Sequence, residues 1–266
     1  MIVIKYGGHA MTDSTGVFAE VIQNYLSSGK SCVIVHGGGP QIDQALKEHK
    51  LESAFIGGFR VTTPEIFAVV QQVLSGNVLR ELVGQLRSSG VPAVGISGRD
   101  GGTLKAKILK KLVDGTPVDL GRVGEVCEVD LKLLKALLAA GFTPVVSPIA
   151  VEISGELEMS QHGLNVNADL AAAAIAGALD SSDLIFMTDV AGIYVNWPNQ
   201  DSLIEKISAS ELDEIKSKFK DGMAPKVRAC LDAIAKGAKA VRIIDGRNPQ
   251  ALAQALAGSG GTLVYS

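Results

Sequence analysis

The chain lacks the features that identify most nucleic-acid-binding, membrane-spanning and secreted proteins. Its 25 basic and 28 acidic residues leave a formal net charge of −3, so no broad basic field is available for nucleic acid or anionic lipid. No apolar run approaches the roughly 20 residues of a membrane span, and Met1 leads almost directly into a strand-like segment without signal-peptide character. We therefore expect a cytoplasmic protein with a local, concave binding site and no nucleic-acid or membrane partner.

Residues that hold metals or form redox centres are also few. The three cysteines, Cys32, Cys127 and Cys230, show neither zinc nor redox spacing, and the four histidines form no ligand-spaced cluster. We therefore expect reduced, structural cysteines and no metal held by protein side chains. The chemistry then falls to Lys, Asp, Asn and Arg side chains and to backbone shaped by the 30 glycines.

Short Val/Ile-rich runs alternate along the chain with amphipathic stretches, a pattern typical of helices packed on a buried parallel sheet. Predicted strands cover residues 2–6, 31–36, 92–97, 143–147, 184–188, 240–245 and 262–265, and predicted hairpins cover 104–128 and 151–159. Predicted helices cover residues 17–26, 62–89, 130–140, 167–179, 208–219, 223–236 and 249–257. The fold class is therefore α/β, a three-layer αβα sandwich with a largely parallel, open central sheet.

Local capping chemistry marks three of these helix starts. Thr62 is followed three residues later by Glu65, and Glu211 holds the same position after the predicted start at residue 208, so both are capping-box patterns. Asn167 is a predicted N-cap in its own right. No repeat or low-complexity linker interrupts the chain, and the loop-like stretch 196–202 is too short to separate domains. We expect one domain over residues 1–266.

The first predicted strand ends in a lysine and two glycines. Lys5 is followed by Gly7 and Gly8, which places an ammonium group beside backbone that a ligand can approach closely. A phosphate neighbour fits this arrangement. The alternative is a lysine that snorkels from the end of a strand.

The second predicted strand ends in a run of three glycines. Gly37, Gly38 and Gly39 free the backbone to wrap an anion, and the following helix begins near Gln41, so its amides add positive potential. The run is neither a P-loop nor the spaced-glycine dinucleotide fingerprint. It indicates an anion site, and the alternative is a plain glycine-rich turn.

Polar residues at two further helix starts are candidates for substrate contacts. Arg60 follows two glycines, and its guanidinium could grip a carboxylate through two parallel hydrogen bonds, although a surface arginine is the alternative. Asn167 is explained by capping. Asn165 and Asp169 are left as polar side chains beside an apolar helix, where an aspartate could hold lysines in register.

The C-terminal half has one lysine at a helix start and one polar turn after a strand. Lys226 lies in the first turn of a predicted helix, where an ammonium and helix-start amides suit a nucleotide phosphate; the alternative is a solvated lysine. The segment from Asp189 to Tyr194 follows a buried strand and is a natural place for a ribose or base.

Six segments, taken together and in this order, resemble those of the acetylglutamate kinases in the amino-acid kinase family. They are Lys5-Tyr6-Gly7-Gly8, His36-Gly37-Gly38-Gly39, Gly58-Phe59-Arg60-Val61-Thr62, Asn165-Val166-Asn167-Ala168-Asp169, Thr188-Asp189-Val190-Ala191-Gly192 and Gly222-Met223-Ala224-Pro225-Lys226. The first glycine clusters are shared widely in that family, whereas segments 58–62 and 165–169 are much more specific to the acetylglutamate enzymes. The resemblance spans nearly the whole chain.

The resemblance implies ATP-dependent phosphorylation of the γ-carboxylate of N-acetyl-L-glutamate, a step of arginine biosynthesis, with Mg²⁺ carried on the ATP phosphates. A lobe of about residues 1–180 would hold the acyl amino acid, and a lobe of about 181–266 would hold ATP. The implied catalytic residues are Lys5, Lys226 and Asp169, which orients both lysines. The implied substrate-binding residues are Gly38, Gly39, Arg60 for the α-carboxylate and Asn165 for the acetylamino group. The implied nucleotide-binding residues are Gly7, Gly8, Gly37, Asp189, Gly192, Ile193, Tyr194, Gly222 and Met223.

Family analogy also suggests an oligomeric state. Arginine-inhibited members carry an extra N-terminal helix, whereas Lys5 lies four residues after Met1 here. We therefore expect a homodimer insensitive to arginine, with the helix after Thr62 at its interface. The segment 98–102 looks more like the regulated members, so the two indications conflict.

Three other functions are compatible with parts of the sequence. A lysine-pathway kinase would act on an acylated aminoadipate one methylene longer, a difference worth only about 1 to 3 kcal/mol in an apolar pocket; Phe59 and Arg60 favour the acetyl amino acid. A non-catalytic ligand sensor could share the fold, but Lys5, Asp169 and Lys226 together argue for catalysis. A nucleotide-dependent oxidoreductase is disfavoured because the spaced-glycine fingerprint is missing.

Overall fold

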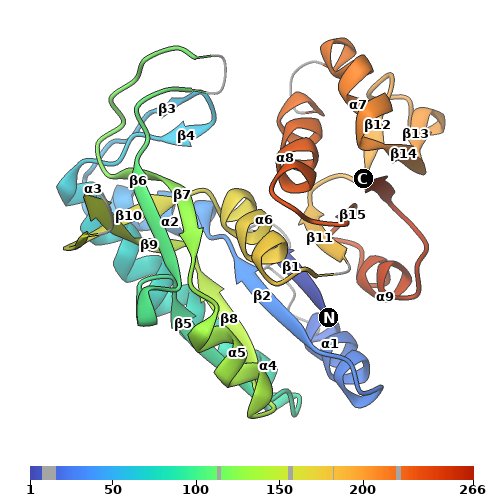
Figure 1. The fold of residues 1–266 in the computed structure, drawn as a ribbon, viewed down its shortest axis with the longest axis horizontal. Coiled ribbons are helices and arrows are strands. Elements are labelled where there is room, and N and C mark those ends of the chain that lie inside the picture. Colours follow the sequence, from blue (N-terminus) through green and yellow to red (C-terminus); the bar gives the residue numbers. More distant parts are fainter. Residues whose placement is uncertain (8–15, 113–114, 155–157, 182, 220–222) are drawn as a thin grey trace.

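The computed structural model describes residues 1–7, 16–112, 115–154, 158–181, 183–219 and 223–266, and it is built around one eight-stranded sheet (Figure 1). The sheet has the order β14 (Lys206–Ser208), β16 (Thr262–Tyr265), β15 (Ala240–Asp245), β11 (Asp183–Thr188), β1 (Ile2–Tyr6), β2 (Cys32–His36), β8 (Thr143–Ser147) and β5 (Ala93–Ser97). Every neighbouring pair is parallel except β15 and β16. The predicted largely parallel central sheet is confirmed.

Helices cover both faces of this sheet. Side chains along a strand alternate between the faces, so Val33 on β2 joins one apolar core and its neighbour Ile34 joins the other. The first core includes α5 (Lys132–Ala139), α6 (Ala168–Ala178), α7 (Ala209–Ile215) and α8 (Met223–Ala235). The second includes α1 (Val17–Ser27), α4 (Leu79–Ser88) and α9 (Ala251–Leu256). The three layers of the predicted αβα sandwich are therefore present.

Smaller elements extend the sheet's N-terminal half, on the left of Figure 1. They are α2 (Gly39–Glu48), α3 (Pro64–Gln71), the hairpin of β3 (Phe55–Ile56) and β4 (Phe59–Arg60), and a closed four-stranded sheet of β6 (Leu104–Ile108), β7 (Val123–Val129), β9 (Ile149–Ser154) and β10 (Glu158–Val166). The predicted hairpin pairings of β6 with β7 and of β9 with β10 are confirmed. In the C-terminal half, β12 (Ile193–Tyr194) pairs with β13 (Leu203–Ile204). The short pairs β3–β4 and β12–β13 and strand β14 have no counterpart in the sequence prediction.

Capping agrees with the sequence in two places and differs in one. Asn167 caps α6 by accepting hydrogen bonds from the N–H groups of Asp169 and Leu170, and the residue before α7 forms a full capping box with Glu211. The predicted cap at Thr62 is wrong: Thr63 caps α3, and Pro64 follows at the first helical position. Thr62 is instead fully buried in a bridge to Gly121. The bridge to Gly121 holds Thr62 outside the helix.

The predicted helix from residue 62 to 89 is one continuous helical segment with a change of type in the middle. It comprises α3, the π-helical turn η2 (Gln72–Val78) and α4. Among the described residues, Pro64–Ser88 is one helix that is long and apolar enough to cross a membrane by length and composition, but half of its apolar window is buried inside the protein. Core helices pass the same test, so this is weak evidence for a span.

The direction of the chain through the sheet positions a crevice. From β1 the chain passes to β2 on one side, whereas β11 lies on the other side of β1 and leads to β15 beyond it. In open α/β sheets, ligands bind outside the carboxyl ends of the strands where the strand order reverses in this way. The residues that follow β1, β2 and β11 are therefore the place to look for a site.

Candidate functional site

Lys5 and Asp169 meet at the carboxyl end of β1. Lys5 Nζ lies 3.0 Å from Asp169 Oδ1, with 13% of the lysine side chain and 34% of the aspartate side chain exposed. Asp169 is held in the first turn of α6 by the Asn167 cap. Burial, and secondarily the Asp169 charge, raise the pKa of the Cys230 thiol, and Cys230 lies one turn after Lys226 on α8. The Asp169 carboxylate thus faces Lys5, and its helix α6 packs against α8.

Gly7 lies close to the Lys5 ammonium and to the backbone of β11. A Cβ atom at Gly7 would lie 2.7 Å from the carbonyl oxygen of Met187 and 3.0 Å from Lys5 Nζ. Gly7 is buried directly after β1, beside Met187 of β11. Only glycine fits here without displacing the ammonium, as expected for a residue that lets backbone approach a functional group closely.

The glycine run after β2 is tied to β1 and to a buried histidine. The Gly37 N–H donates to the Tyr6 carbonyl at 2.9 Å, and His36 Nδ1 lies 2.7 Å from the Gly37 carbonyl, to which it must donate. His36 Nε2 is then a buried acceptor without a hydrogen-bond partner among the described residues. Burial lowers the pKa of His36 to about 4, although its bond to Gly37 opposes this. The imidazole is therefore neutral at pH 7.

Gly38 and Gly39 begin α2, and the two have different surroundings. Gly38 is buried, and a Cβ atom there would lie 2.7 Å from Leu74 Cδ2 in the π-helical turn η2. Gly39 has nothing within 4 Å of its Cβ position. Gly38 lets η2 pack closely against the glycine run 37–39, and Gly39 leaves open space beside the same run. The backbone amides at the start of α2 favour an anion at this point.

Arg60 is buried and faces α2. Its side chain is only 6% exposed, and Nη2 lies 2.7 Å from Asp43 Oδ1 on α2, while the Asp43 side chain is 61% exposed. The guanidinium carbon also lies 4.6 Å from the centre of the Phe55 ring. Gly57 and Gly58 connect β3 to β4 with φ angles of 57° and 84°, the two left-handed residues that a tight hairpin turn requires. The hairpin thus carries Arg60 to the middle of α2.

A continuous chain of contacts joins Arg60 to Asp169. The Thr62 hydroxyl donates to the Arg60 carbonyl at 2.7 Å and accepts from Asn165 Nδ2 at 3.2 Å. Asn165 is followed after one residue by the α6 cap Asn167, which fixes Asp169. The predicted substrate-side residues Arg60 and Asn165 are therefore brought together, two hydrogen bonds apart.

Lys226 pairs with Asp189 on the other side of the crevice. Lys226 Nζ lies 3.1 Å from Asp189 Oδ1, with side-chain exposures of 20% and 52%. Partial burial opposes the shift, yet hydrogen bonding to Lys226 lowers the pKa of the Asp189 carboxyl. Lys226 thus forms an ion pair with Asp189, and Lys5 forms one with Asp169. That Asp169 orients both lysines stays a prediction.

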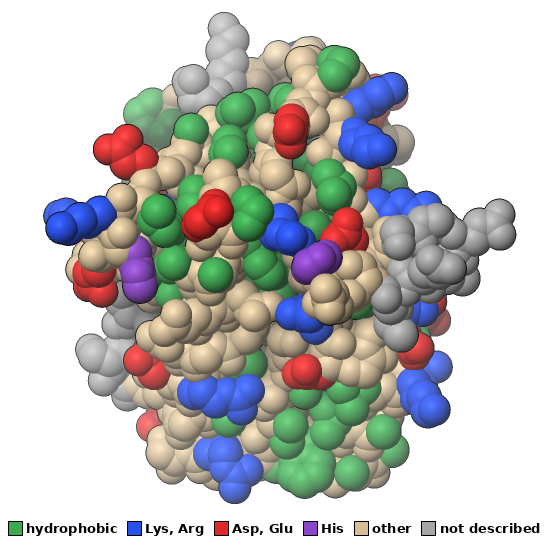
Figure 2. Space-filling model, turned by 90° about the vertical axis from the view of Figure 1, so that its left-hand side faces the viewer, with side chains coloured by type: hydrophobic (Ala, Val, Ile, Leu, Met, Phe, Trp, Pro, Cys, Tyr) green, Lys and Arg blue, Asp and Glu red, His purple; other side chains and the backbone are tan. Residues whose placement is uncertain are grey.

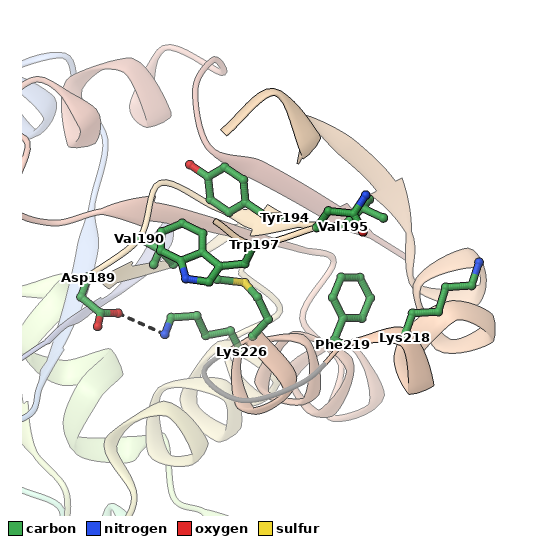
Figure 3. Close-up of a pocket in the computed structure, with 10 residues that line it drawn as sticks. Asp189, Val190, Tyr194, Val195, Trp197, Lys218, Phe219 and Lys226 are labelled. Atoms are coloured by element: carbon green, nitrogen blue, oxygen red, sulfur yellow. Dashed lines mark ion pairs between the residues drawn. The ribbon is translucent and has the colours of Figure 1, made fainter. Parts of the chain in front are cut away.

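The Lys226–Asp189 pair lies at one end of a cavity of about 570 Å³. Figure 3 shows the two side chains beneath Val190 and Trp197, with Phe219 and Lys218 farther along. The predicted nucleotide residues Tyr194 and Met223 also line the cavity. Gly192 and Ile193 lie behind its wall: a Cβ atom at Gly192 would collide with Thr262, and the fully buried Ile193 donates its N–H to the Thr262 hydroxyl.

Two predicted site residues, Gly8 and Gly222, lie outside the described residues. Other residues of the site were missed by the sequence prediction. Asp43 sits at mid-helix on α2 with no motif around it, and its pairing with Arg60 follows from the hairpin. Trp197 lies in a stretch that reads only as a loop, although a lone tryptophan just after a predicted nucleotide segment is a usable indication.

The surface of the N-terminal half has no field of one charge sign on the face drawn in Figure 2, among the side chains it colours. Basic and acidic side chains are interspersed there, with apolar side chains between them. The two lysines and the arginine described above each have an aspartate partner.

Comparisons with known proteins agree with this geometry. A model of the amino acid kinase family matches residues 1–245. The acetylglutamate kinase of Arthrobacter sp. (strain FB24) is 49% identical over 253 residues, which cover 94% of this chain and 82% of that protein. The acetylglutamate kinase of Corynebacterium urealyticum is 45% identical over 263 residues, 98% of this chain and 84% of that protein.

A solved structure gives the same result for the fold. The protein smu.665 of Streptococcus mutans UA159 superposes with a TM-score of 0.79 at 30% identity, covering 99% of this chain and 98% of that one. The family model matches most of the chain, and the sequence relatives match across nearly all of it. The chain belongs to the amino acid kinase family and, within it, to the acetylglutamate kinases.

Proposed function

We propose that the protein transfers the γ-phosphoryl group of ATP to the γ-carboxylate of N-acetyl-L-glutamate, the reaction that the names of its relatives describe. One observation carries the proposal: two lysine–aspartate pairs, Lys5–Asp169 and Lys226–Asp189, lie at the carboxyl ends of the adjacent strands β1 and β11 and at the start of α8. They flank the point where the strand order reverses. A phosphoryl group passing between two bound substrates needs positive charge from both sides at such a point.

The chemistry asks for positioning and charge neutralisation and needs no strong base. A side-chain carboxylate has a reference pKa of about 4.3 and is already ionised at neutral pH. One carboxylate oxygen forms a bond to the γ-phosphorus as the bond to the bridging oxygen breaks, and that oxygen leaves with the electron pair on ADP. Negative charge spreads over the transferred oxygens in this transition state. Lys5, Lys226 and glycine amides are the groups placed to stabilise it.

The acyl amino acid would bind on the N-terminal side. Arg60 has further N–H groups besides the nitrogen that faces Asp43, and a guanidinium binds a carboxylate through two of them. We assign it the α-carboxylate, Asn165 the acetylamino group, and the backbone of Gly38 and Gly39 the remaining substrate contacts. Asp169 orients Lys5.

ATP would bind on the C-terminal side, in the cavity that Asp189, Tyr194, Met223 and Lys226 line. Gly192 and Ile193 support its wall, and Gly7, Gly8, Gly37 and Gly222 are assigned to the phosphates. This division corresponds to lobes of about residues 1–180 and 181–266 within one domain. Among the described residues no group of three or more His, Cys, Asp or Glu side chains could hold a metal ion. We assign Mg²⁺ to the ATP phosphates, where it would neutralise part of their charge.

A homodimer through the Pro64–Ser88 helix is part of the proposal. The large apolar side chains of this helix are already buried or half-buried in the single chain, so this part of the proposal rests on the family resemblance. Sedimentation at working concentration should give a dimer, and a hexamer would contradict it. The predicted cytoplasmic location stays a prediction.

The test is ATP turnover with Mg²⁺ and N-acetyl-L-glutamate, trapping the acyl phosphate with hydroxylamine. Glutamate, N-acetylaspartate and N-acetyl-aminoadipate are run in parallel. Hydroxamate from acetylglutamate alone supports the proposal, and product only from the longer acid would assign the protein to the lysine pathway. No hydroxamate from any acid would contradict kinase activity and favour a sensor. When Lys5 or Lys226 is replaced by alanine, Lys239→Ala is the matched control, because Lys239 pairs with Asp180 at the exposed surface.

A further inference from the structure

Trp197 is an exposed aromatic side chain on the wall of a cavity whose other large apolar side chains are mostly buried. It is 55% exposed, whereas Val190, Tyr194, Phe219 and Met223 around the same cavity are each less than a tenth exposed. Tryptophan carries a large apolar surface, and leaving it in water within a concave site forgoes the stabilisation that burial gives. A flat apolar ligand part would recover that stabilisation.

The loop that carries Trp197 is held in place on both sides. The Val195 N–H donates to the Ser202 carbonyl at 3.0 Å, and the Asn196 N–H donates to the Ser202 hydroxyl at 3.1 Å. Beyond Trp197, the Asn199 N–H donates to the Asn196 carbonyl at 2.8 Å. The Tyr194 ring meets the indole edge-on, with centroids 5.1 Å apart and planes at 63°. The indole is therefore preorganised before any ligand arrives, which lowers the entropic cost of binding.

We propose that Trp197 is the base-binding residue of the nucleotide site and stacks on the purine ring. This rests on the proposed function, since it assigns the cavity to ATP. Figure 3 shows the Trp197 indole above the Asp189–Lys226 pair at one end of the cavity, with Phe219 and Lys218 toward the other end. A base stacked on this indole would keep the nucleotide phosphates close to the Lys226 ammonium.

The stacking has a direct optical readout, because Trp197 is the single tryptophan of the chain. ADP and inorganic tripolyphosphate are titrated separately, with Mg²⁺, into the full-length protein while tryptophan emission is recorded. We expect a saturable emission change with ADP. Tripolyphosphate should compete with ADP yet leave the emission unchanged by itself, because it carries no base. An equal change with both compounds would overturn the inference.

Substitutions separate stacking from other effects on binding. Trp197→Ala should raise KM for ATP by roughly 5- to 150-fold, the range that loss of one stacked base corresponds to, with KM for the acyl substrate unchanged. Trp197→Phe should retain most of the affinity. Phe142→Ala removes another exposed aromatic side chain, just after α5 and away from the cavity, and is the matched control.

The outcomes also separate this inference from the proposed function. A Trp197→Ala enzyme that phosphorylates N-acetyl-L-glutamate with the wild-type KM for ATP refutes the stacking and leaves the proposed function in place. A protein whose emission responds to ADP but not to tripolyphosphate, and which phosphorylates none of the acids, keeps the base subsite and loses the proposed reaction. Calorimetry with ADP shows whether Trp197→Ala still binds where turnover is too slow to measure.

Discussion

The two sides of the crevice are built in different ways. On the N-terminal side, the Lys5 and Arg60 side chains are largely buried, and Gly7 lies close to the Lys5 ammonium. On the C-terminal side, Asp189 and Trp197 are largely exposed around an open cavity. The first side is a closed, self-paired network, and the second is an open pocket with one ion pair at its end.

This difference matches what each side is proposed to hold. A small dianionic acid must be aligned for attack, and alignment within a fraction of an ångström depends on side chains that cannot move. A nucleotide is larger and brings its own base, ribose and phosphates, so a few fixed contacts and an open volume suffice. Substitutions should therefore be tolerated less well on the N-terminal side than at the matching position on the C-terminal side.

The largest expected effect tests this asymmetry at the two lysines. Lys5→Ala and Lys226→Ala should each lower kcat by roughly 10²- to 10³-fold, about 2.7 to 4 kcal/mol, as for the loss of one preorganised donor. Lys5→Arg should fail as badly, because a planar fork cannot replace a compact ammonium against Gly7. Lys226→Arg should retain more turnover, since Lys226 borders the open cavity.

Single-turnover and steady-state kinetics on all four variants check this prediction. A loss of less than threefold in either alanine variant would contradict the assigned catalytic function. Equal turnover in the two arginine variants would contradict the asymmetry while leaving that function intact. Lys239→Ala again serves as the control for removing a paired lysine.

The second effect is on stability in acid and should begin on the N-terminal side. His36 in the folded protein takes up a proton only near pH 4, whereas in the unfolded chain it does so near 6.5. The unfolded state therefore binds more protons between these values, and stability falls as pH drops through the window, by up to about 3 kcal/mol. The lowered pKa of the Asp189 carboxyl also stabilises the folded protein. This stabilisation is complete above the pKa of the carboxyl in the unfolded chain and is lost only as the pH falls below it.

Urea unfolding between pH 7 and 4 measures this slope. His36→Asn should flatten it, because the titrating ring is gone while an amide can still donate to the Gly37 carbonyl. His49→Asn, at an exposed position after α2, should keep the wild-type slope. An unchanged slope in the His36 variant would show that other groups cause the acid loss.

Much of the fold could be predicted because its information is local. Short runs rich in Val, Ile and Leu predicted the bounds of β1, β8, β15 and β16 to the residue, and side-chain caps predicted the starts of α6 and α7. The sequence prediction failed where contacts between residues far apart in the chain determine the local structure. Thr62 became a buried bridge to Gly121, and the pair β12–β13 depends on hydrogen bonds from the loop around Ser202 and from Thr262.

The site divides in the same way. Glycines and charged residues at strand ends are visible in the sequence, so Lys5, Arg60, Asp169 and Lys226 were placed around one crevice in advance. Which aspartate each cation meets depends on how helices and hairpins pack. Asp43 and Trp197 carry no motif, and their importance follows only from the groups that the fold sets beside them.

A third, smaller effect compares two glycines of the N-terminal side. Gly7→Ala would push a methyl group against the Met187 carbonyl and Lys5 Nζ, and overpacking of this kind typically costs about 1 to 3 kcal/mol. Gly39→Ala meets nothing within 4 Å, so its stability should stay within about 0.5 kcal/mol of wild type. Thermal and urea unfolding of both variants test this. Equal stability in the pair would show that the backbone around Gly7 yields easily.

The smallest expected effect concerns how Arg60 is oriented. Asp43 is largely exposed, and a pair with one exposed partner is worth about 0.2 to 1 kcal/mol. Asp43→Asn should therefore raise KM for the acyl substrate by roughly two- to fivefold, leaving kcat and KM for ATP unchanged. Asp43→Glu should recover part of the loss, because it restores the charge near the guanidinium. If the Asp43 carboxylate instead competes with the substrate for Arg60, the asparagine variant will have a lower KM, and the sign of the change decides between orientation and competition.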